Sequence, residues 1–216
     1  EEPVTLAGGE VVRLRRPTYS ITDLAYGELD PATTLSPRVT QPMLGLGLVQ
    51  AIHEADILAL ADPNDADGDG ISGKAAVAID PKTGRKTLGR FGWKAQAATV
   101  RQQSAEAFAL DIGISTPEVP LPDGDCTPAQ PACLAMPNGE QSERGVSEGP
   151  DPVLDLVTFY SQNLGVPRRR DIDDPAVLRG KQQFYALGCI SCHTPKYVTS
   201  REAITDAHKF QLIWPY

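Results

Sequence analysis

Two cysteines and a histidine form the sequence Cys189-Ile-Ser-Cys192-His193, which has the spacing of a haem c attachment site. Thiols three positions apart can each form a thioether with the porphyrin edge, and the following histidine can bind the iron as its proximal ligand. Zinc ribbons and thioredoxin-like domains also use Cys-x-x-Cys. However, zinc sites usually need a second ligand pair, and none here has zinc-like spacing. A thioredoxin motif should follow a strand, whereas this one follows a helix pattern. We therefore predict a covalent haem at Cys189 and Cys192 with His193 on the iron.

A second pair of cysteines, Cys126 and Cys133, flanks a proline-rich loop that contains no metal-binding pattern. We predict that these two residues form a disulfide, which would indicate an oxidising compartment. Covalent haem attachment suggests the same kind of compartment, the bacterial periplasm or an equivalent space. Two free thiols are the alternative interpretation.

Three aspartates alternate along an acidic stretch and match positions 1, 3 and 5 of a calcium-binding loop: Asp65, Asp67 and Asp69. Gly70 follows at position 6, but position 12 is Ala76 rather than a bidentate glutamate, so this is not a complete EF-hand. Further oxygens would come from neighbouring side chains: Asp62, Asn64 or Asp80. We predict a calcium ion here, and an acidic turn without an ion is the alternative.

The composition limits the class of protein. The net charge is −8, from 28 acidic and 20 basic residues, which disfavours nucleic-acid binding. No apolar run approaches the length needed to span a membrane. There are 19 glycines and 19 prolines, and aromatic residues make up only 6%. This composition predicts short helices joined by long loops, with a cofactor replacing part of the side-chain core.

Local signals place the helices that would position these residues. Thr99 and Gln102 form a capping box, and Gly113 supplies a helix end, so a helix is predicted between them. Gln103 falls on the same face as Val100, where a buried amide needs partners. Shorter helices are predicted within residues 46–60, with His53 on the surface, and a strand over residues 11–14.

Two further helices are predicted from Asp-Pro start signals. The first begins with Asp151 as N-cap, and its predicted inward face consists of Val153, Leu156, Val157, Tyr160 and Leu164. The second begins at Asp174-Pro175 and ends at Leu187, with Gly188 as its cap, so the haem motif follows it directly. A helix, a glycine and Cys-x-x-Cys-His is the order in which a cytochrome c domain begins.

These features, together with several longer stretches, resemble one known family. The stretches are Ser36-Pro-Arg38, Gly45-Leu-Gly-Leu48, Ile57-Leu-Ala-Leu-Ala-Asp-Pro63, Asp67-Gly-Asp-Gly-Ile-Ser-Gly73, Gly89-Arg-Phe-Gly-Trp-Lys-Ala95, Asp111-Ile-Gly-Ile114, Phe159-Tyr-Ser-Gln-Asn-Leu164 and Gly188-Cys-Ile-Ser-Cys-His-Thr-Pro195. The sequence resembles the di-haem thiol oxidoreductases, which are related to bacterial di-haem cytochrome c peroxidases and to MauG.

The resemblance implies a mainly α, cytochrome c-like fold built from short helices and long loops. Members of this family contain two such folds, each with its own haem, so two haems are expected in the full-length protein. The present chain would be a fragment of that two-domain protein. Residues 1–164 would form the C-terminal part of the first domain with loop insertions, residues 165–174 a linker, and residues 175–216 the start of the second domain.

The resemblance also implies catalytic residues. The peroxidase relatives carry a tryptophan between the haems and a distal-pocket glutamine ten residues later, and Trp93 and Gln103 keep this spacing. An acid follows in those relatives. Asp111 is its nearest match here, although it comes early and is aspartate. Gln103 and Asp111 would lie on the distal side of the first haem.

The expected function is that of a periplasmic or secreted, peroxidase-like di-haem c oxidoreductase. It would pass electrons between the haem on His193 and a second haem outside this fragment. The expected partners are an electron-donor or acceptor protein and a small oxidant such as peroxide. An electron-transfer cytochrome without its own catalysis and a calcium-stabilised secreted binding domain are the alternatives. No further haem ligand is assigned among the remaining candidates: Met43, Met136, His53 and His208.

Overall fold

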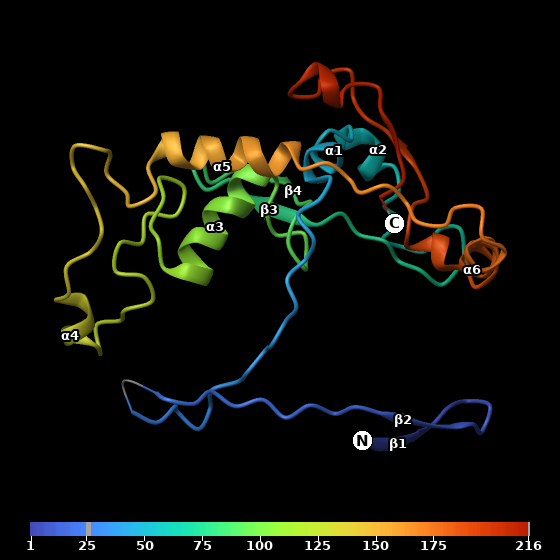
Figure 1. The fold of residues 1–216 in the computed structure, drawn as a ribbon, viewed down its shortest axis with the longest axis horizontal. Coiled ribbons are helices and arrows are strands. Elements are labelled where there is room, and N and C mark those ends of the chain that lie inside the picture. Colours follow the sequence, from blue (N-terminus) through green and yellow to red (C-terminus); the bar gives the residue numbers. More distant parts are fainter. Residues whose placement is uncertain (25–26, 216) are drawn as a thin grey trace. The chain divides into compact units, whose positions relative to one another are not determined.

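The computed structural model describes residues 1–24 and 27–215, which form two compact units, Glu1–Thr40 and Gln41–Tyr216. Figure 1 shows short helices and long connecting loops, as the sequence predicts, together with small hairpins that it did not predict. The cytochrome c-like arrangement and the boundary at residues 165–174 stay predictions. Within the described residues the longest helices have 13 residues, too few to cross a membrane.

The first unit contains one antiparallel hairpin, formed by β1 (Glu2–Thr5) and β2 (Val11–Leu14). The strand predicted over residues 11–14 is therefore confirmed. Its connecting turn closes through a hydrogen bond from the Leu6 backbone N–H to the Glu10 carbonyl at 2.8 Å. Both strands are largely exposed, and the ion pair between Arg16 and Glu2 is also on the surface.

The core of the second unit lies where α1 (Leu46–Gln50) meets the start of α3 (Val100–Ile112). Phe91, Ala97 and Val100 are buried there, and Leu46 and Val49 of α1 pack against them. Gln50 joins the two helices directly, because its Oε1 accepts a hydrogen bond from the Val100 backbone N–H at 2.7 Å.

The half-buried side chain of Arg90 caps the C-terminal end of α1. Its guanidinium donates hydrogen bonds to the carbonyls of Val49 at 3.3 Å and Ile52 at 2.8 Å. Such carbonyls have no partner within the helix, so a cation is well placed beside them. The next helix, α2 (Glu54–Leu58), begins at His53, whose exposed ring accepts a hydrogen bond from the Ala55 backbone N–H through Nδ1.

Helix α3 packs across α5 (Asp151–Asn163), as Figure 1 shows. Small side chains predominate among the residues that the two helices bury, which lets their backbones approach each other. The buried residues are Val100, Gln102, Ser104, Ala105 and Ala109 on α3, and Leu154, Thr158 and Ser161 on α5.

The predicted inward face of α5 was largely wrong, since only Val157 and Leu164 of its five residues are half-buried. Val153, Leu156 and Tyr160 are 44%, 71% and 65% exposed, whereas Leu154, Thr158 and Ser161 are buried. Helix α5 starts one residue earlier than predicted, with Pro150 rather than Asp151 as N-cap. The carboxylate of Asp151 is instead bound to Arg101 of α3.

Helices α1 and α5 approach closely at Gly47. A Cβ atom built on this glycine would lie only 2.1 Å from the carbonyl oxygen of Gln162 and 2.9 Å from Nε2 of His208. His208 is buried at the end of the short 3-10 helix η2 (Asp206–His208), where its Nδ1 lies 2.8 Å from the Thr205 hydroxyl. Glycine is therefore required at position 47 by packing.

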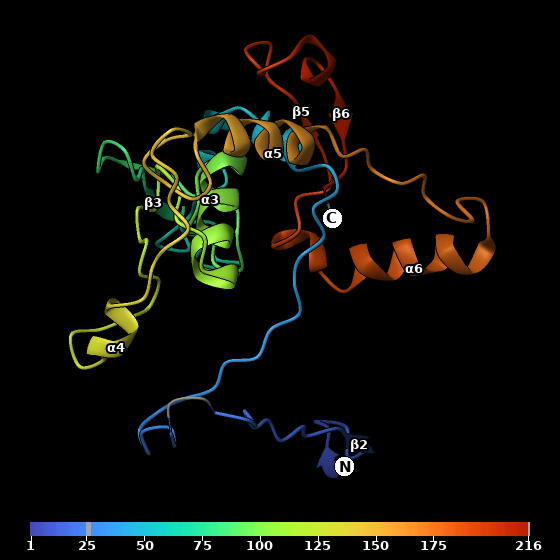
Figure 2. The same cartoon turned by 60° about the vertical axis from the view of Figure 1, so that its left-hand side comes forward.

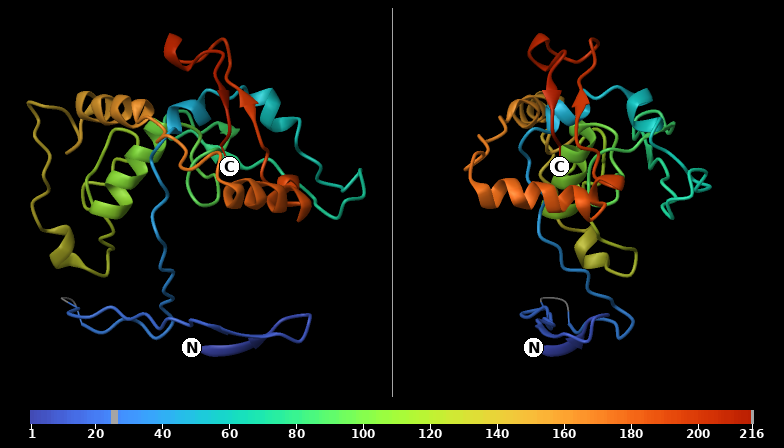
Figure 3. Two further views of the ribbon diagram at one scale, coloured as in Figure 1. Left: turned by 45° about the vertical axis from the view of Figure 1, so that its right-hand side comes forward. Right: turned by 90° about the vertical axis from the view of Figure 1, so that its right-hand side faces the viewer.

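Two more antiparallel hairpins complete the unit. β3 (Val77–Ile79) pairs with β4 (Lys86–Leu88), and β5 (Tyr197–Val198) pairs with β6 (Leu212–Ile213), the second of which is visible in both views of Figure 3. The segment after β5 returns to α1, because the Ser200 backbone N–H donates to the Ala51 carbonyl at 2.7 Å. A short helix, α4 (Pro131–Leu134), lies in the long loop between α3 and α5.

Candidate functional site

Helix α6 (Pro175–Ala186) leads directly into the Cys-x-x-Cys-His sequence, as Figure 2 shows. The Asp174 carboxylate caps its start by accepting a hydrogen bond from the Ala176 backbone N–H at 2.6 Å. After the helix, Gly188 adopts a left-handed conformation with φ of 74° and starts the 3-10 turn η1 (Cys189–Ser191). The predicted start of this helix is confirmed, and the helix ends at Ala186, one residue before the predicted Leu187. Its geometry follows from local capping.

The three potential haem-binding side chains lie close together on this turn. The His193 backbone N–H donates to the Cys189 carbonyl at 2.9 Å, so the histidine sits one helical turn after the first cysteine. Both thiols are free, with Cys189 half-buried and Cys192 exposed. Across residues 1–24 and 27–215, neither imidazole nitrogen of His193 takes part in a hydrogen bond. Its ring does contact Phe184, with centroids 5.7 Å apart.

This donor set fits a haem c. It offers two free thiols for thioether formation and an imidazole that follows them directly, and partly exposed apolar side chains lie along the helix that precedes it. Leu178, Tyr185 and Leu187 are 47%, 40% and 75% exposed along α6. A porphyrin would cover apolar surface of this kind, which is otherwise costly to leave in water.

Gln103 lies on the second turn of α3 and is half-buried. Its amide oxygen Oε1 is buried and accepts no hydrogen bond from any described residue. A buried polar atom without a partner costs on the order of 1–3 kcal/mol, so native proteins seldom retain one without a reason. The predicted burial of this side chain is therefore partial, and its oxygen is the buried atom left without a hydrogen-bond donor.

The neighbouring residue, Gln102, is the fully bonded glutamine of α3. Its Oε1 accepts from the Ala98 backbone N–H at 2.9 Å, and its Nε2 donates to the Ile79 carbonyl at 3.0 Å and to Glu106 at 2.8 Å. The Thr99 hydroxyl caps the helix by accepting from the Gln102 backbone N–H, as predicted. The Gln102 side chain, however, reaches Ala98 rather than Thr99.

Sequence reasoning missed Glu106, which is four residues after Gln102 and three after Gln103. Burial raises the pKa of Glu106, and the negative charge of Glu118 adds to this, while the hydrogen bond from Gln102 opposes it. Side chains three and four positions apart share one side of a helix, so the spacing was the available signal. Glu106 is the acidic residue of α3 nearest in sequence to Gln103.

Trp93 and Asp111 occupy more open positions than Gln103. Trp93 lies in the turn after Phe91 and is 55% exposed. Asp111 is exposed on the last turn of α3, eight residues after Gln103, which corresponds to roughly 12 Å along the helix axis. The structure therefore places Asp111 and Gln103 too far apart for a direct hydrogen bond.

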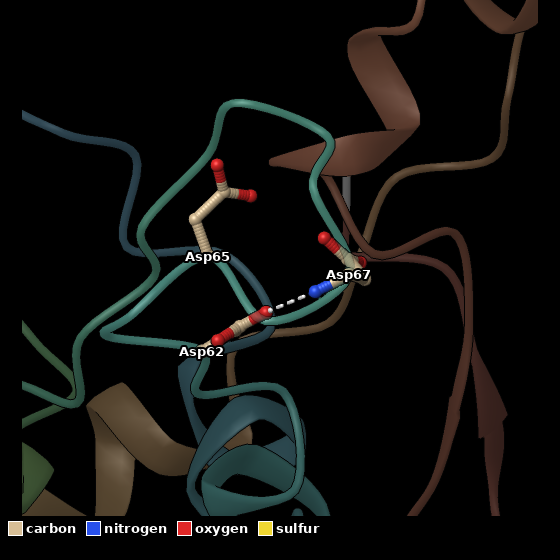
Figure 4. A group of neighbouring side chains, drawn as sticks. All are labelled: Asp62, Asp65 and Asp67. Atoms are coloured by element: carbon tan, nitrogen blue, oxygen red, sulfur yellow. Dashed lines mark hydrogen bonds between the residues drawn. The ribbon is translucent and has the colours of Figure 1, made fainter.

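The acidic loop brings together a different trio from the predicted one. Carboxylate oxygens of Asp62, Asp65 and Asp67 lie within 4.8 Å of one another, as Figure 4 shows. The backbone N–H of Ala66 donates to Asp62 and lowers the pKa of that carboxyl. Asp69 turns instead to the backbone N–H of Ile71, at 2.8 Å. Oxygens arranged like those of the trio suit a hard cation such as calcium.

The remaining cysteines, Cys126 and Cys133, form a disulfide with a Cα–Cα distance of 5.8 Å. It closes a small loop that includes α4. The base of the larger excursion is held by Glu148, whose Oε1 accepts from Gly139 at 2.7 Å and whose Oε2 accepts from Ser115 at 2.8 Å. Hydrogen bonds from these backbone groups, chiefly from Ser115, lower the pKa of Glu148 despite partial burial.

One protein-family model matches the chain over residues 1–216, and its description is "di-haem oxidoreductase, putative peroxidase". Searches of curated proteins and of solved structures gave no match.

Proposed function

Because the chain belongs to the di-haem oxidoreductase family, we propose that it forms the haem-bearing part of a periplasmic, peroxidase-like di-haem c enzyme. One observation carries this proposal. Two free thiols, and an imidazole without a hydrogen bond to any described residue, lie on a single turn at the end of a well-capped helix. This arrangement is suited to covalent haem attachment. It is not suited to zinc, because the sequence has no second ligand pair with zinc-like spacing.

Each residue of the turn has a distinct role in this proposal. Cys189 and Cys192 hold the porphyrin edge, His193 binds the iron, and Phe184 packs against the imidazole and limits its rotation. A haem bound here would supply one-electron redox chemistry, while the protein fixes its position and surroundings. The second haem of the family would be held by residues outside this chain.

Helix α3 supplies the polar groups for reaction with an oxidant. The buried Oε1 of Gln103 can accept a hydrogen bond from a peroxide O–H, which would orient the oxidant and hold its proton. We assign proton transfer to an acid of α3, with Asp111 as the candidate from the family pattern and Glu106 as the candidate from burial. The exposed ring of Trp93 would mediate electron exchange between the haems.

A periplasmic location is supported by two features of the cysteines. The Cys126–Cys133 disulfide is of the kind that forms and persists in an oxidising compartment, and covalent haem attachment suggests the bacterial periplasm or an equivalent space. Calcium bound by Asp62, Asp65 and Asp67 would neutralise the repulsion between these carboxylates and stabilise the loop.

A second candidate function is simple electron transfer. The exposure of Cys192 and His193 favours it, because an accessible haem edge exchanges electrons readily with other proteins. The separation of Asp111 from Gln103 also weakens the family-based catalytic trio. Electron transfer without catalysis requires that neither haem react rapidly with peroxide.

The test uses the full-length protein purified with its haems. Acid–acetone extraction should leave the haem on the chain, and Cys189→Ser with Cys192→Ser should abolish attachment at this site. Release of all haem from the wild-type protein would disprove the proposal. Optical and EPR spectra before and after peroxide then separate the two functions, since only the peroxidase should form high-valent iron.

Variants of α3 test the catalytic assignment. Three variants should slow the reaction with peroxide while both haems stay bound: Gln103→Ala, Glu106→Gln and Asp111→Asn. Of the two acid variants, the one that slows this reaction more identifies the proton carrier. Trp93→Ala should slow electron exchange between haems. Wild-type rates in all four variants would exclude these roles and favour electron transfer.

A further inference from the structure

A cavity of about 550 Å³ lies where three segments that are distant in the chain meet. Its walls come from the start of α1, from the linker between α5 and α6, and from β6 with the residues that follow it. The lining includes Leu44, Leu48, Val166, Arg169, Leu212 and Trp214, and we refer to it as the α1–β6 cavity. None of its lining residues belongs to α6 or to the Cys-x-x-Cys-His turn, so it is distinct from the residues assigned to the haem.

The walls of the α1–β6 cavity are tied to one another. The Gly45 backbone N–H donates to the Leu164 carbonyl at 3.0 Å, and a Cβ built on Gly45 would lie 2.7 Å from Cγ2 of Val166. The linker therefore packs directly on the start of α1. The β5–β6 hairpin is held to the end of the same helix by the hydrogen bond from Ser200 to Ala51. A cavity whose walls are already fixed costs little ordering when a ligand binds.

Most of the lining is apolar and accessible. Leu44, Val166, Leu212 and Trp214 each leave a large part of the side chain exposed. Apolar side chains gathered around a cavity of about 300–1,000 Å³ are typical of small-molecule sites. The indole of Trp214 adds a flat face on which an aromatic ring can stack. The lining therefore favours a ligand with a planar apolar body.

The polar side-chain groups of the lining are both hydrogen-bond donors: the guanidinium of Arg169 and the indole N–H of Trp214. Neither forms a hydrogen bond or an ion pair with a residue that the structure describes. Asp174, the acid at the end of the linker, instead caps α6. Donors without an acceptor beside them select a ligand that accepts, and a guanidinium binds a planar carboxylate through two parallel hydrogen bonds.

We propose that the α1–β6 cavity binds an aromatic carboxylate, with the carboxylate on Arg169 and the ring against Trp214. The positive charge is local, because Arg168, Arg169 and Arg170 are consecutive in a chain whose net charge is −8. The chain as a whole repels an anion, so affinity for one depends on this cluster. The inference goes beyond the proposed function, because no step of it involves a haem.

The test is titration calorimetry on the full-length protein purified with its haems. The probes are naphthoate, an aromatic carboxylate, and naphthamide, a neutral molecule of the same shape. Naphthoate should bind about tenfold or more tighter than naphthamide, because only the carboxylate forms charged hydrogen bonds with Arg169. Inorganic phosphate should not compete, since it covers none of the apolar lining. Equal binding of the two naphthyl probes, or no binding of naphthoate, would overturn the proposal.

Variants of the arginine cluster locate the site. Arg169→Gln should weaken naphthoate binding about tenfold or more and leave naphthamide binding unchanged. Arg168→Gln is the matched control: it removes the same charge at the next exposed residue, which does not line the cavity, and should change affinity less than about threefold. Equal losses in the two variants would show that only net charge matters and would refute the site.

The ring contact has its own test. Trp214→Ala should weaken both naphthyl probes about tenfold, whereas Trp214→Phe, which keeps a ring, should retain most of the affinity. Far-UV circular dichroism checks that both variants fold, and Arg169→Gln tests the same site without altering the strand. Laurate, a flexible carboxylate without a ring, should bind more weakly than naphthoate. Tighter binding of laurate, or unchanged naphthoate binding in a folded Trp214→Ala protein, would exclude an aromatic ligand.

Discussion

Arg101 binds three carboxylates at once, and their different burial gives a quantitative prediction. Its guanidinium contacts Glu118, Asp151 and Asp155, which joins α3 to α5 and to the loop that follows α3. Partial burial acts to lower the pKa of Arg101, but the pairs with Glu118 and Asp155 outweigh this and raise it. The Glu118 side chain is 6% exposed, whereas that of Asp155 is 67% exposed.

Replacing Glu118 by glutamine should cost far more than replacing Asp155 by asparagine. Removing one partner of a buried ion pair costs about 3–5 kcal/mol, because the other charge is left without compensation. Arg101 keeps its two remaining aspartates and is 21% exposed, so we expect a cost at or just below the bottom of this range, roughly 2–3 kcal/mol, for Glu118→Gln. Asp155→Asn removes a solvent-screened pair and should cost about 0–1 kcal/mol.

The assay is urea denaturation followed by far-UV circular dichroism, at low and high salt. High salt should remove most of the Asp155→Asn effect and little of the Glu118→Gln effect. Lys82→Gln is the matched control: Lys82 lies 3.6 Å from the same Glu118 oxygen but is 53% exposed, so its loss should change stability by less than about 1 kcal/mol. Equal costs for Glu118→Gln and Asp155→Asn would refute the argument from burial.

Three more predictions follow from local geometry. Gly47→Ala should destabilise the protein by about 3 kcal/mol or more because the new Cβ meets the Gln162 carbonyl. Gly180→Ala, with open space in α6, should stabilise by about 0.5–1 kcal/mol. A calorimetric melting temperature that rises in Gly47→Ala or falls in Gly180→Ala would contradict the prediction for that variant. The lowered pKa of Glu148 means that its stabilisation is present above the ordinary glutamate pKa and lost as pH falls through the lower folded-state value. Glu148→Gln should therefore flatten the acid limb of melting temperature against pH, and an unchanged slope would count against the Ser115 and Gly139 contacts. A chelator should lower the melting temperature of the wild-type protein but not that of Asp62→Asn. Asp80→Asn is the control and should respond like wild type, because Asp80 accepts a hydrogen bond from Thr83 within its own turn. A response retained in Asp62→Asn would exclude the proposed cation trio.

The sequence by itself determined those features that arise from contacts between near neighbours. The start of α3 at Thr99, the cap of α6 at Asp174, and the glycine ends at Gly113 and Gly188 were all predictable. Each depends on a side chain bonding a backbone group two or three residues away, or on a glycine adopting positive φ. The Cys-x-x-Cys-His turn belongs to the same group, because its geometry follows from the helix before it.

The tertiary structure alone decided which surfaces meet. The apolar spacing of α5 suggested the face of Leu156 and Tyr160, but close crossing with α3 selected the face of Leu154 and Ser161, where small side chains permit approach. Likewise Gln102 rather than Gln103 became the bonded glutamine, because Ile79 of a distant strand lies within its reach. Periodicity shows that a helix has an apolar side. Which side is buried depends on steric fit to a partner distant in the chain, and local sequence cannot encode it.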